Sequence, residues 1–329
     1  MSEGSSPRAS RDTTWLRLLT IAIAWLALQQ VLARYGAYLV PLSVARHLTL
    51  QTFLMIVQVV VTAAGLGLAA IVLRSLRRDM GIGLPSRWQA STILLSTPML
   101  FVLASYVAIG IALPTLMEEI ARGGAAVSQQ NAGEFGRALK KDPVVLTVVW
   151  GVVFAPFAEE LLFRGALWSA VASLTRRFER PREQKRDSLE TFLEESAVQR
   201  AARAVWRWAL QGGIATLFAA AVFGWMHADM KGGVGIVRVV STTCLGLACG
   251  AARHVTGSVL AAVLVHFVFN LLSIGQTRRW WAVAGFSSLY GVSTLIMLVA
   301  SLLAIALLVV WIARRSAQRR DAMAAAEES

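Results

Sequence analysis

The chain has 329 residues, 56% of them hydrophobic, and its mean hydropathy is +0.60. Several apolar runs reach the ~20 residues that an α-helix needs to cross a bilayer, so the composition excludes an ordinary soluble domain. The net charge of +13 does not indicate nucleic-acid binding, because the Lys and Arg residues lie in the loops between apolar runs, as expected for a membrane protein.

The apolar runs predict an all-α fold, a polytopic membrane helical bundle of about eight transmembrane helices. In chain order, the expected spans are 15–33, 52–73, 91–114, 144–173, 206–228, 234–252, 257–274 and 289–313. We expect Pro98 and Pro114 to interrupt the third span, because proline lacks the backbone N–H that continues a helix. Arg238 lies within the sixth span and is expected to reach the membrane surface or to face the bundle interior.

The spans divide the chain into a tail, a first group of helices with an outside loop, a core segment, and a last helix with a basic tail. Their boundaries are 1–14, 15–142, 143–274 and 275–329. Most Lys and Arg residues fall in loops on one side of the membrane, together with both termini. The positive-inside rule therefore predicts a multi-pass protein of the inner or plasma membrane, with its N-terminus and C-terminus in the cytoplasm.

The fourth span contains two adjacent glutamates, Glu159 and Glu160, and Arg164 follows one helical turn later. A charged side chain at the bilayer centre costs ~2.5–3.5 kcal/mol on insertion scales, so three in one span indicate a function. Glu160 and Arg164 are four residues apart, share a helix face and are expected to pair. Glu159 lies about 100° further round the helix and stays free for chemistry. Pro156 is expected to kink the helix beside the glutamates.

Two further spans each carry one histidine, His227 and His266, and Asn270 follows the second histidine by four residues. Each polar group alone is explained as a hydrogen-bonded core residue. Together they predict a hydrolytic site, because polar groups on separate membrane helices must converge or each remain costly. The two cysteines, Cys244 and Cys249, lie on different faces of one span and are expected to be small buried hydrophobic residues.

Three short motifs carry a resemblance to a known family. They are Glu-Glu-Leu-Leu-Phe-Arg (159–164), Phe-Gly-Trp-Met-His (223–227) and His-Phe-Val-Phe-Asn (266–270). In this order they match EExxxR, FxxxH and HxxxN, and the chain resembles the CAAX prenyl protease 2-like intramembrane endopeptidases. This family, also called CPBP or Abi, includes bacteriocin-processing and immunity proteins. The resemblance covers residues 144–274 and makes the segment 143–274 the expected catalytic core.

The resemblance implies proteolysis within the membrane by a glutamate-activated water. The implied catalytic residues are Glu159, Glu160, Arg164, His227, His266 and Asn270. Glu159 would be the general base, His227 and His266 would help to hold the water, and Asn270 would donate to the oxyanion. Glu160 and Arg164 would orient the site. The implied partner is a membrane-associated protein or peptide, such as a prenylated protein or a bacteriocin leader, entering a cavity that we expect to open toward the cytoplasmic leaflet.

The family is often labelled metalloprotease, and Glu159, His227 and His266 would also form a catalytic zinc ligand set. The helical HExxH arrangement is absent from the sequence, so no cofactor is assigned and zinc is kept as an alternative. Other interpretations are a catalytically inactive membrane scaffold or immunity factor, a proton-coupled transporter, and a haem protein with the two histidines as axial ligands. The sequence predicts neither the substrate nor the oligomeric state.

Overall fold

The computed structural model describes residues 13–39, 50–73, 75–122, 144–176 and 212–277. All regular secondary structure in these ranges is helical, and no strand occurs within them. The predicted all-α membrane bundle is therefore confirmed. The expected last span (289–313) and most of the loop 174–205 lie outside the described residues.

Besides the segment that carries the glutamates, the described ranges contain seven helices. Their bounds are α1 Thr14–Leu39, α3 Leu50–Val72, α4 Leu76–Asp79, α5 Arg87–Ala121, α13 Ile214–Met226, α14 Gly232–Thr256 and α15 Val259–Thr277. By length and composition, four of the described helices can cross a membrane: α1, α3, α5 and α14. Helices α13 and α15 are apolar but shorter.

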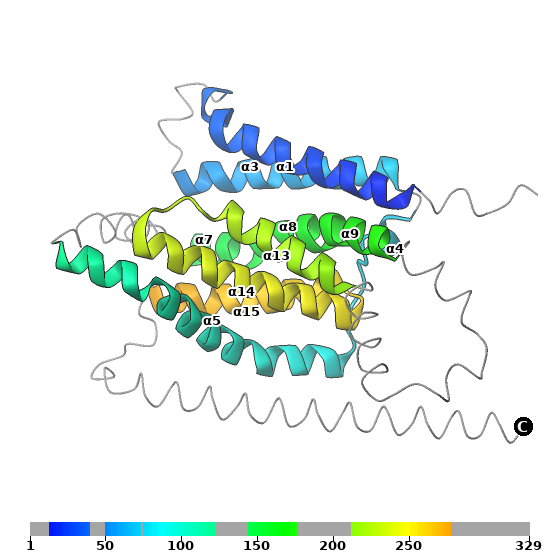
Figure 1. Cartoon of the computed structure of the whole chain (residues 1–329). Helices are drawn as coiled ribbons and strands as arrows, with labels where there is room; N and C mark the ends of the chain where they lie inside the picture. Colours follow the sequence, from blue (N-terminus) through cyan, green and yellow to red (C-terminus); the bar gives the residue numbers. More distant parts are fainter. Residues whose placement is uncertain (1–12, 40–49, 74, 123–143, 177–211, 278–329) are drawn as a thin grey trace, which may run out of the picture.

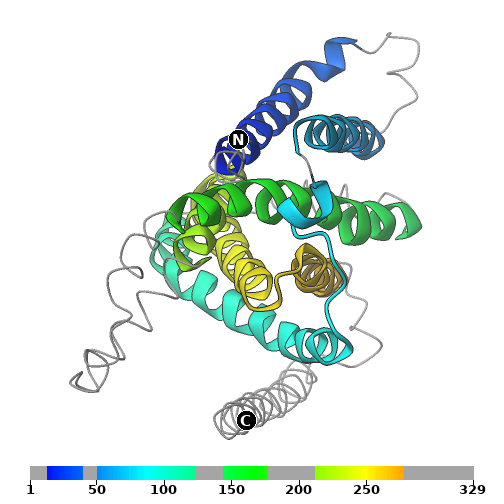
Figure 2. The same ribbon diagram turned by 90° about the vertical axis from the view of Figure 1, so that its right-hand side faces the viewer.

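The glutamate-bearing segment runs between two groups of helices (Figures 1 and 2). Helices α1 and α3 pack together on one side of it, and α14, α15 and α5 pack against one another on the other side. Helix α1 contacts the end of the segment, and α15 contacts its middle. A continuous cluster of buried apolar side chains joins these layers and surrounds the ionisable residues.

Helix α5 continues through both of its prolines, against our prediction that Pro98 and Pro114 would interrupt it. Each proline removes one backbone hydrogen bond, but the remaining bonds of a helix of 35 residues are unaffected. Packing of α5 against α14 and α15 supports the helix at the same time. Prolines are tolerated within membrane helices for this reason, because neighbouring helices compensate for the lost backbone bond.

The fourth predicted span is one helical run that changes its winding on both sides of the glutamates. Its parts are α7 Val144–Val148, η1 Val149–Phe154, α8 Ala155–Glu160, η2 Leu161–Leu167 and α9 Trp168–Thr175. The segments η1 and η2 are wide π-helical turns, which occur often at functional sites. Pro156, in the first turn of α8, lacks an N–H and thus accounts for the widened turn before it. No sequence signal accounts for η2.

Helices α13 and α14 approach each other closely at small residues spaced by four. A Cβ atom added to Gly246 would lie 2.9 Å from the Cα of Ala220, and one added to Gly250 would lie 2.6 Å from Cγ2 of Thr216. Small residues at this spacing let membrane helices pack backbone against backbone. The contact brings the Gly246 carbonyl to the side chain of Arg164.

Candidate active site

Glu160 and Arg164 form the fully buried centre of the site. Arg164 Nη1 lies 2.9 Å from Glu160 Oε1, and neither side chain is exposed, which confirms the pairing that their spacing predicted. Arg164 Nη2 also donates to the Gly246 carbonyl at 2.7 Å. The guanidinium carbon lies 5.0 Å from the centre of the Phe223 ring, a cation–π arrangement. These contacts neutralise both charges and fix the carboxylate in place.

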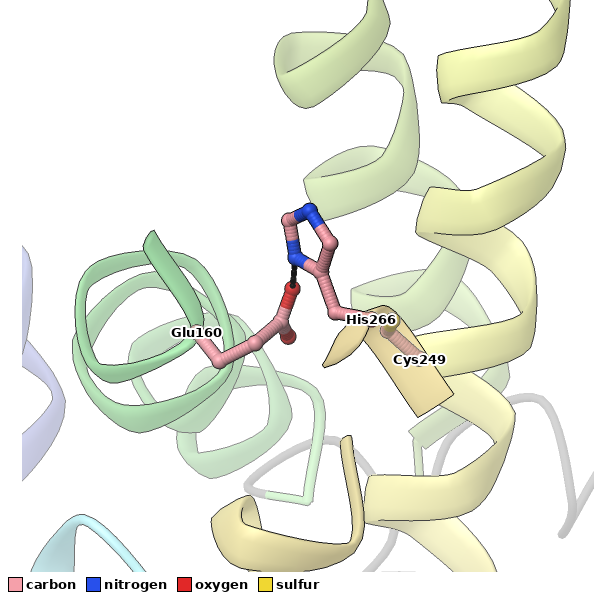
Figure 3. Close-up of side chains that lie close together, drawn as sticks. All are labelled: Glu160, Cys249 and His266. Atoms are coloured by element: carbon pink, nitrogen blue, oxygen red, sulfur yellow. Dashed lines mark hydrogen bonds and ion pairs between the residues drawn. The ribbon is translucent and has the colours of Figure 1, made fainter. Parts of the chain in front are cut away.

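His266, on α15, reaches both glutamates. Its Nδ1 lies 2.9 Å from Glu160 Oε1 (Figure 3), and its Nε2 lies 3.8 Å from Glu159 Oε2. An ionised carboxylate only accepts hydrogen bonds, so Nδ1 carries the proton and donates a hydrogen bond to Glu160 Oε1. In the neutral ring Nε2 then keeps its lone pair, and this lone pair faces Glu159.

Glu159 differs from its neighbour in exposure and in hydrogen bonding. Its side chain is 18% exposed, whereas that of Glu160 is fully buried. The 3.8 Å between Glu159 Oε2 and His266 Nε2 is too long for a direct hydrogen bond. A gap of this size between two polar atoms suits a bridging water.

His227 caps the C-terminal end of α13, and Phe223 lies between it and the other site residues. His227 Nδ1 donates to the Phe223 carbonyl at 2.8 Å, which leaves its Nε2 as an acceptor in the neutral ring. The Phe223 ring lies 4.6 Å from the His227 ring and stands edge-on to the His266 ring at 5.6 Å. Among the described residues, His227 thus contacts the site through the Phe223 ring, and its Nδ1 is bonded to the backbone of its own helix.

Asn270 projects toward the same helical run as His266, as their spacing predicted. Asn270 Nδ2 donates to the Gly151 carbonyl in η1 at 2.8 Å. A carboxamide nitrogen has two N–H groups, so one remains for a further acceptor. Asn270 is half-buried, so a substrate oxygen can reach this group.

Burial around the glutamates is uneven along the helical run. Every residue from Glu160 to Ala170 is buried, whereas Val153, Phe154 and Phe157 are exposed. In the expected topology the residues after Glu160 lead toward the cytoplasm. Exposed apolar side chains on a membrane helix are also what lipid contact produces, so the opening of the cavity toward the cytoplasmic leaflet stays a prediction.

Arg253 was expected in a loop, but the structure buries it in the last turn of α14 at 6% exposure. Its Nε lies 3.4 Å from the Arg164 carbonyl, and its Nη2 lies 3.3 Å from both the Met80 carbonyl and Ser169 Oγ. The guanidinium lies over the Trp168 ring at 5.0 Å. Arg253 thus holds the backbone of η2, which our sequence analysis did not foresee. The four-residue spacing of Gly246 and Gly250 could have predicted the close contact of α14 with α13, but it does not predict the bonds of Arg253.

The residues whose potential metal-ligand atoms lie close together differ from the expected zinc set of Glu159, His227 and His266. In the described ranges, ligand atoms of Glu160, Cys249 and His266 lie within 4.8 Å of one another, and all three residues are buried (Figure 3). A carboxylate, a thiolate and an imidazole are all zinc ligands, so the chemistry of this second set fits the ion. The sequence analysis had assigned Cys249 only a packing role.

Comparison with models of protein families matches residues 141–272 to the family described as type II CAAX prenyl endopeptidase Rce1-like. This match confirms the resemblance that the three motifs carried, and it includes every candidate site residue from Glu159 to Asn270. The comparisons with curated proteins and with solved structures gave no match.

Proposed function

We propose that this protein is a membrane endopeptidase that hydrolyses membrane-associated substrates with a water activated by Glu159, and the match of residues 141–272 to the type II CAAX prenyl endopeptidase Rce1-like family supports this. The observation that carries the proposal is the unequal state of the two glutamates. Glu160 is buried and bonded to Arg164 and His266, whereas Glu159 is partly exposed and faces the His266 lone pair across 3.8 Å. Of the two carboxylates, Glu159 is therefore the one that water can reach.

In the proposed reaction, water between Glu159 and His266 gives its proton to the Glu159 carboxylate while its oxygen attacks the substrate carbonyl carbon. The free N–H of Asn270 donates to the oxyanion that forms, as preorganised donors do in other hydrolytic sites. The carbon–nitrogen bond then breaks, and protonated Glu159 returns the proton to the leaving nitrogen. Glu159 is thus regenerated as a base within one cycle.

Glu160 and Arg164 act through His266 and do not touch the reacting atoms. The ionised Glu160 holds the proton on Nδ1 and therefore fixes the tautomer that presents the Nε2 lone pair to the water. Arg164 pairs with Glu160 and holds its carboxylate in position despite its complete burial. If zinc were bound by the set expected from sequence, Glu159, His227 and His266, it would polarise the substrate carbonyl or its attacking water.

Cleavage by matched variants tests the assignment. Native protein, Glu159→Gln and Glu160→Gln are purified and given the same membrane-associated peptides, and products are identified by mass spectrometry. We expect Glu159→Gln to abolish cleavage without changing thermal unfolding, and Glu160→Gln to lower cleavage and thermal stability together. Cleavage by Glu159→Gln at more than about a tenth of the native rate would refute the role of the base.

We propose a protein or peptide substrate in the membrane, either a prenylated protein or a leader-like peptide. Comparison of new N-termini in membranes that hold native protein or Glu159→Gln identifies the substrates directly. Enrichment of C-terminal processing at lipid-modified cysteines supports the first class, and cleavage after leader-like segments supports the second. Proton flux into liposomes without any cleavage would instead support a transporter.

A further inference from the structure

We propose that a thiophilic divalent cation such as Zn²⁺ binds between Glu160, Cys249 and His266 and inhibits hydrolysis. The three residues come from α8, α14 and α15, so the ion would link the helices around the site. The binding is argued from geometry alone, whereas the inhibition rests on the proposed function. The expected zinc set of the sequence analysis shares only His266 with this one.

The first support is a fully buried oxygen without a partner. Glu160 Oε1 accepts from Arg164 and His266, but Glu160 Oε2 is buried and has no hydrogen-bond partner among the described residues. The Glu160 carboxylate is directed toward His266, with Cys249 beside them (Figure 3). The Cys249 thiol donates to the Ala262 carbonyl at 3.5 Å, which is a weak bond. An unsatisfied oxygen and a weakly bonded thiol are therefore held together out of water.

The second support is the spacing of the ligand atoms. Zinc binds thiolate sulfur at ~2.3 Å and imidazole nitrogen or carboxylate oxygen at ~2.0–2.2 Å, with tetrahedral geometry. Ligand atoms around one ion therefore lie ~3–4 Å apart. The three atoms here already lie within 4.8 Å of one another, so small side-chain rotations complete the set. Three protein ligands leave the fourth position to a water molecule.

The third support is the charge balance. Glu159, Glu160 and the Cys249 thiolate supply three negative charges, and Arg164 and the divalent ion supply three positive charges. The loaded site is thus neutral, which removes the main penalty for placing ions in a low-dielectric interior. Arg164 stays on Glu160 Oε1 while the ion uses Oε2.

Proton accounting explains the inhibition. The Cys249 thiol releases its proton to solvent when it binds the ion. His266 binds through Nδ1, so the proton held there moves to Nε2, the atom that faces Glu159 across 3.8 Å. The new N–H then donates to the water that lies between His266 and the Glu159 carboxylate. The attacking water therefore loses its acceptor, the lone pair of His266 Nε2.

The test uses full-length protein, purified in detergent, freed of metal by a chelator and titrated with Co²⁺ as a spectroscopic probe. We expect one Co²⁺ per chain with a sulfur-to-cobalt charge-transfer band, which Zn²⁺ displaces. Cys249→Ser and Cys249→Ala should lose this band and weaken Zn²⁺ inhibition at least about tenfold, each variant being compared with its own metal-free rate. The matched control is Cys244→Ser, on the same helix and outside the cluster, which should behave like native protein.

The binding of the ion and the inhibition of hydrolysis can be refuted separately. Absence of the charge-transfer band in native protein, or an unchanged band in both Cys249 variants, overturns the binding site. Co²⁺ binding without a sulfur-to-cobalt band, lost in His227→Ala but kept in Cys249→Ala, would assign the ion to the zinc set expected from sequence. A band that depends on Cys249, with no effect of Zn²⁺ on cleavage, overturns the inhibition. Absence of cleavage by metal-free native protein counts against the proposed function and leaves the binding result valid.

Discussion

Replacing Arg164 by leucine removes the only cation paired with Glu160 in the described part of the chain. Leucine fits the apolar surroundings but leaves the Glu160 carboxylate buried and charged. It also leaves the Gly246 carbonyl without the donor that now lies at 2.7 Å. We therefore expect Arg164→Leu to lower the stability of the folded protein strongly.

The magnitude follows from the burial. Breaking a fully buried ion pair by removing one partner costs about 3–5 kcal/mol. An unsatisfied buried carbonyl adds about 1–3 kcal/mol, although the two losses share one side chain and do not simply add. Because folded proteins are stable by only about 5–15 kcal/mol, we expect a large fall in the midpoint of thermal unfolding and in the yield of folded protein.

The chain offers a matched control with the same spacing. Arg122 pairs with Glu118 four residues earlier at 2.5 Å, but both side chains are well exposed. Such exposed pairs are worth at most about 1 kcal/mol, so Arg122→Leu should unfold close to native protein. Adding Glu160→Gln to Arg164→Leu removes the stranded charge and keeps an acceptor for His266, so the double variant should regain stability. Equal stability of Arg164→Leu and Arg122→Leu, or no recovery in the double variant, would refute the reasoning.

Four further outcomes are expected. Glu159→Gln should slow cleavage ~10²–10⁴-fold with unchanged thermal unfolding, and a rate above about a tenth of native contradicts it. Asn270→Asp should lower kcat about 10²–10³-fold with little change in KM, measured by steady-state cleavage, because a carboxylate repels the oxyanion; a native kcat rejects the donor role. Arg253→Lys should unfold at a lower temperature than native protein but above Arg253→Leu, since lysine keeps a charge but loses the planar fork; equal unfolding of both variants contradicts the carbonyl contacts. Cysteines placed around Glu159, in protein lacking Cys244 and Cys249, should react with an impermeant thiol reagent from the cytoplasmic side, and labelling only from the periplasmic side rejects the predicted opening.

Contacts within one helix could be predicted from the sequence, because helical spacing determines which residues share a face. The Glu160–Arg164 pair and the common direction of His266 and Asn270 follow from intervals of four residues. Contacts between helices could not, because they depend on how closely two helices approach and where they cross. Two such contacts are the bond between His266 Nδ1 and Glu160 and the position of Cys249 beside both residues.

The winding of the fourth span was also beyond sequence reasoning. Pro156 indicates a disturbance before the glutamates, but nothing in Leu161–Leu167 distinguishes a π-helical turn from an α-helical one. The contacts of Arg253 with the Arg164 carbonyl and with Ser169 join that segment to a distant part of the chain. An apolar run followed by arginine is typical of a helix end at the membrane surface, so charge alone predicted a solvated side chain.

The bonds made by Arg253 set a limit on how this protein can be divided. The segment that matches the family begins at residue 141, yet Arg253 donates to the carbonyl of Met80, far earlier in the chain. Val259 N–H donates to the Gly81 carbonyl at 3.0 Å, and Ser258 donates to Gly83. A chain cut before residue 141 would leave these donors buried or newly exposed at one end of the bundle. We therefore expect the family segment not to fold on its own, because the backbone between α4 and α5 supports the candidate site from outside that segment.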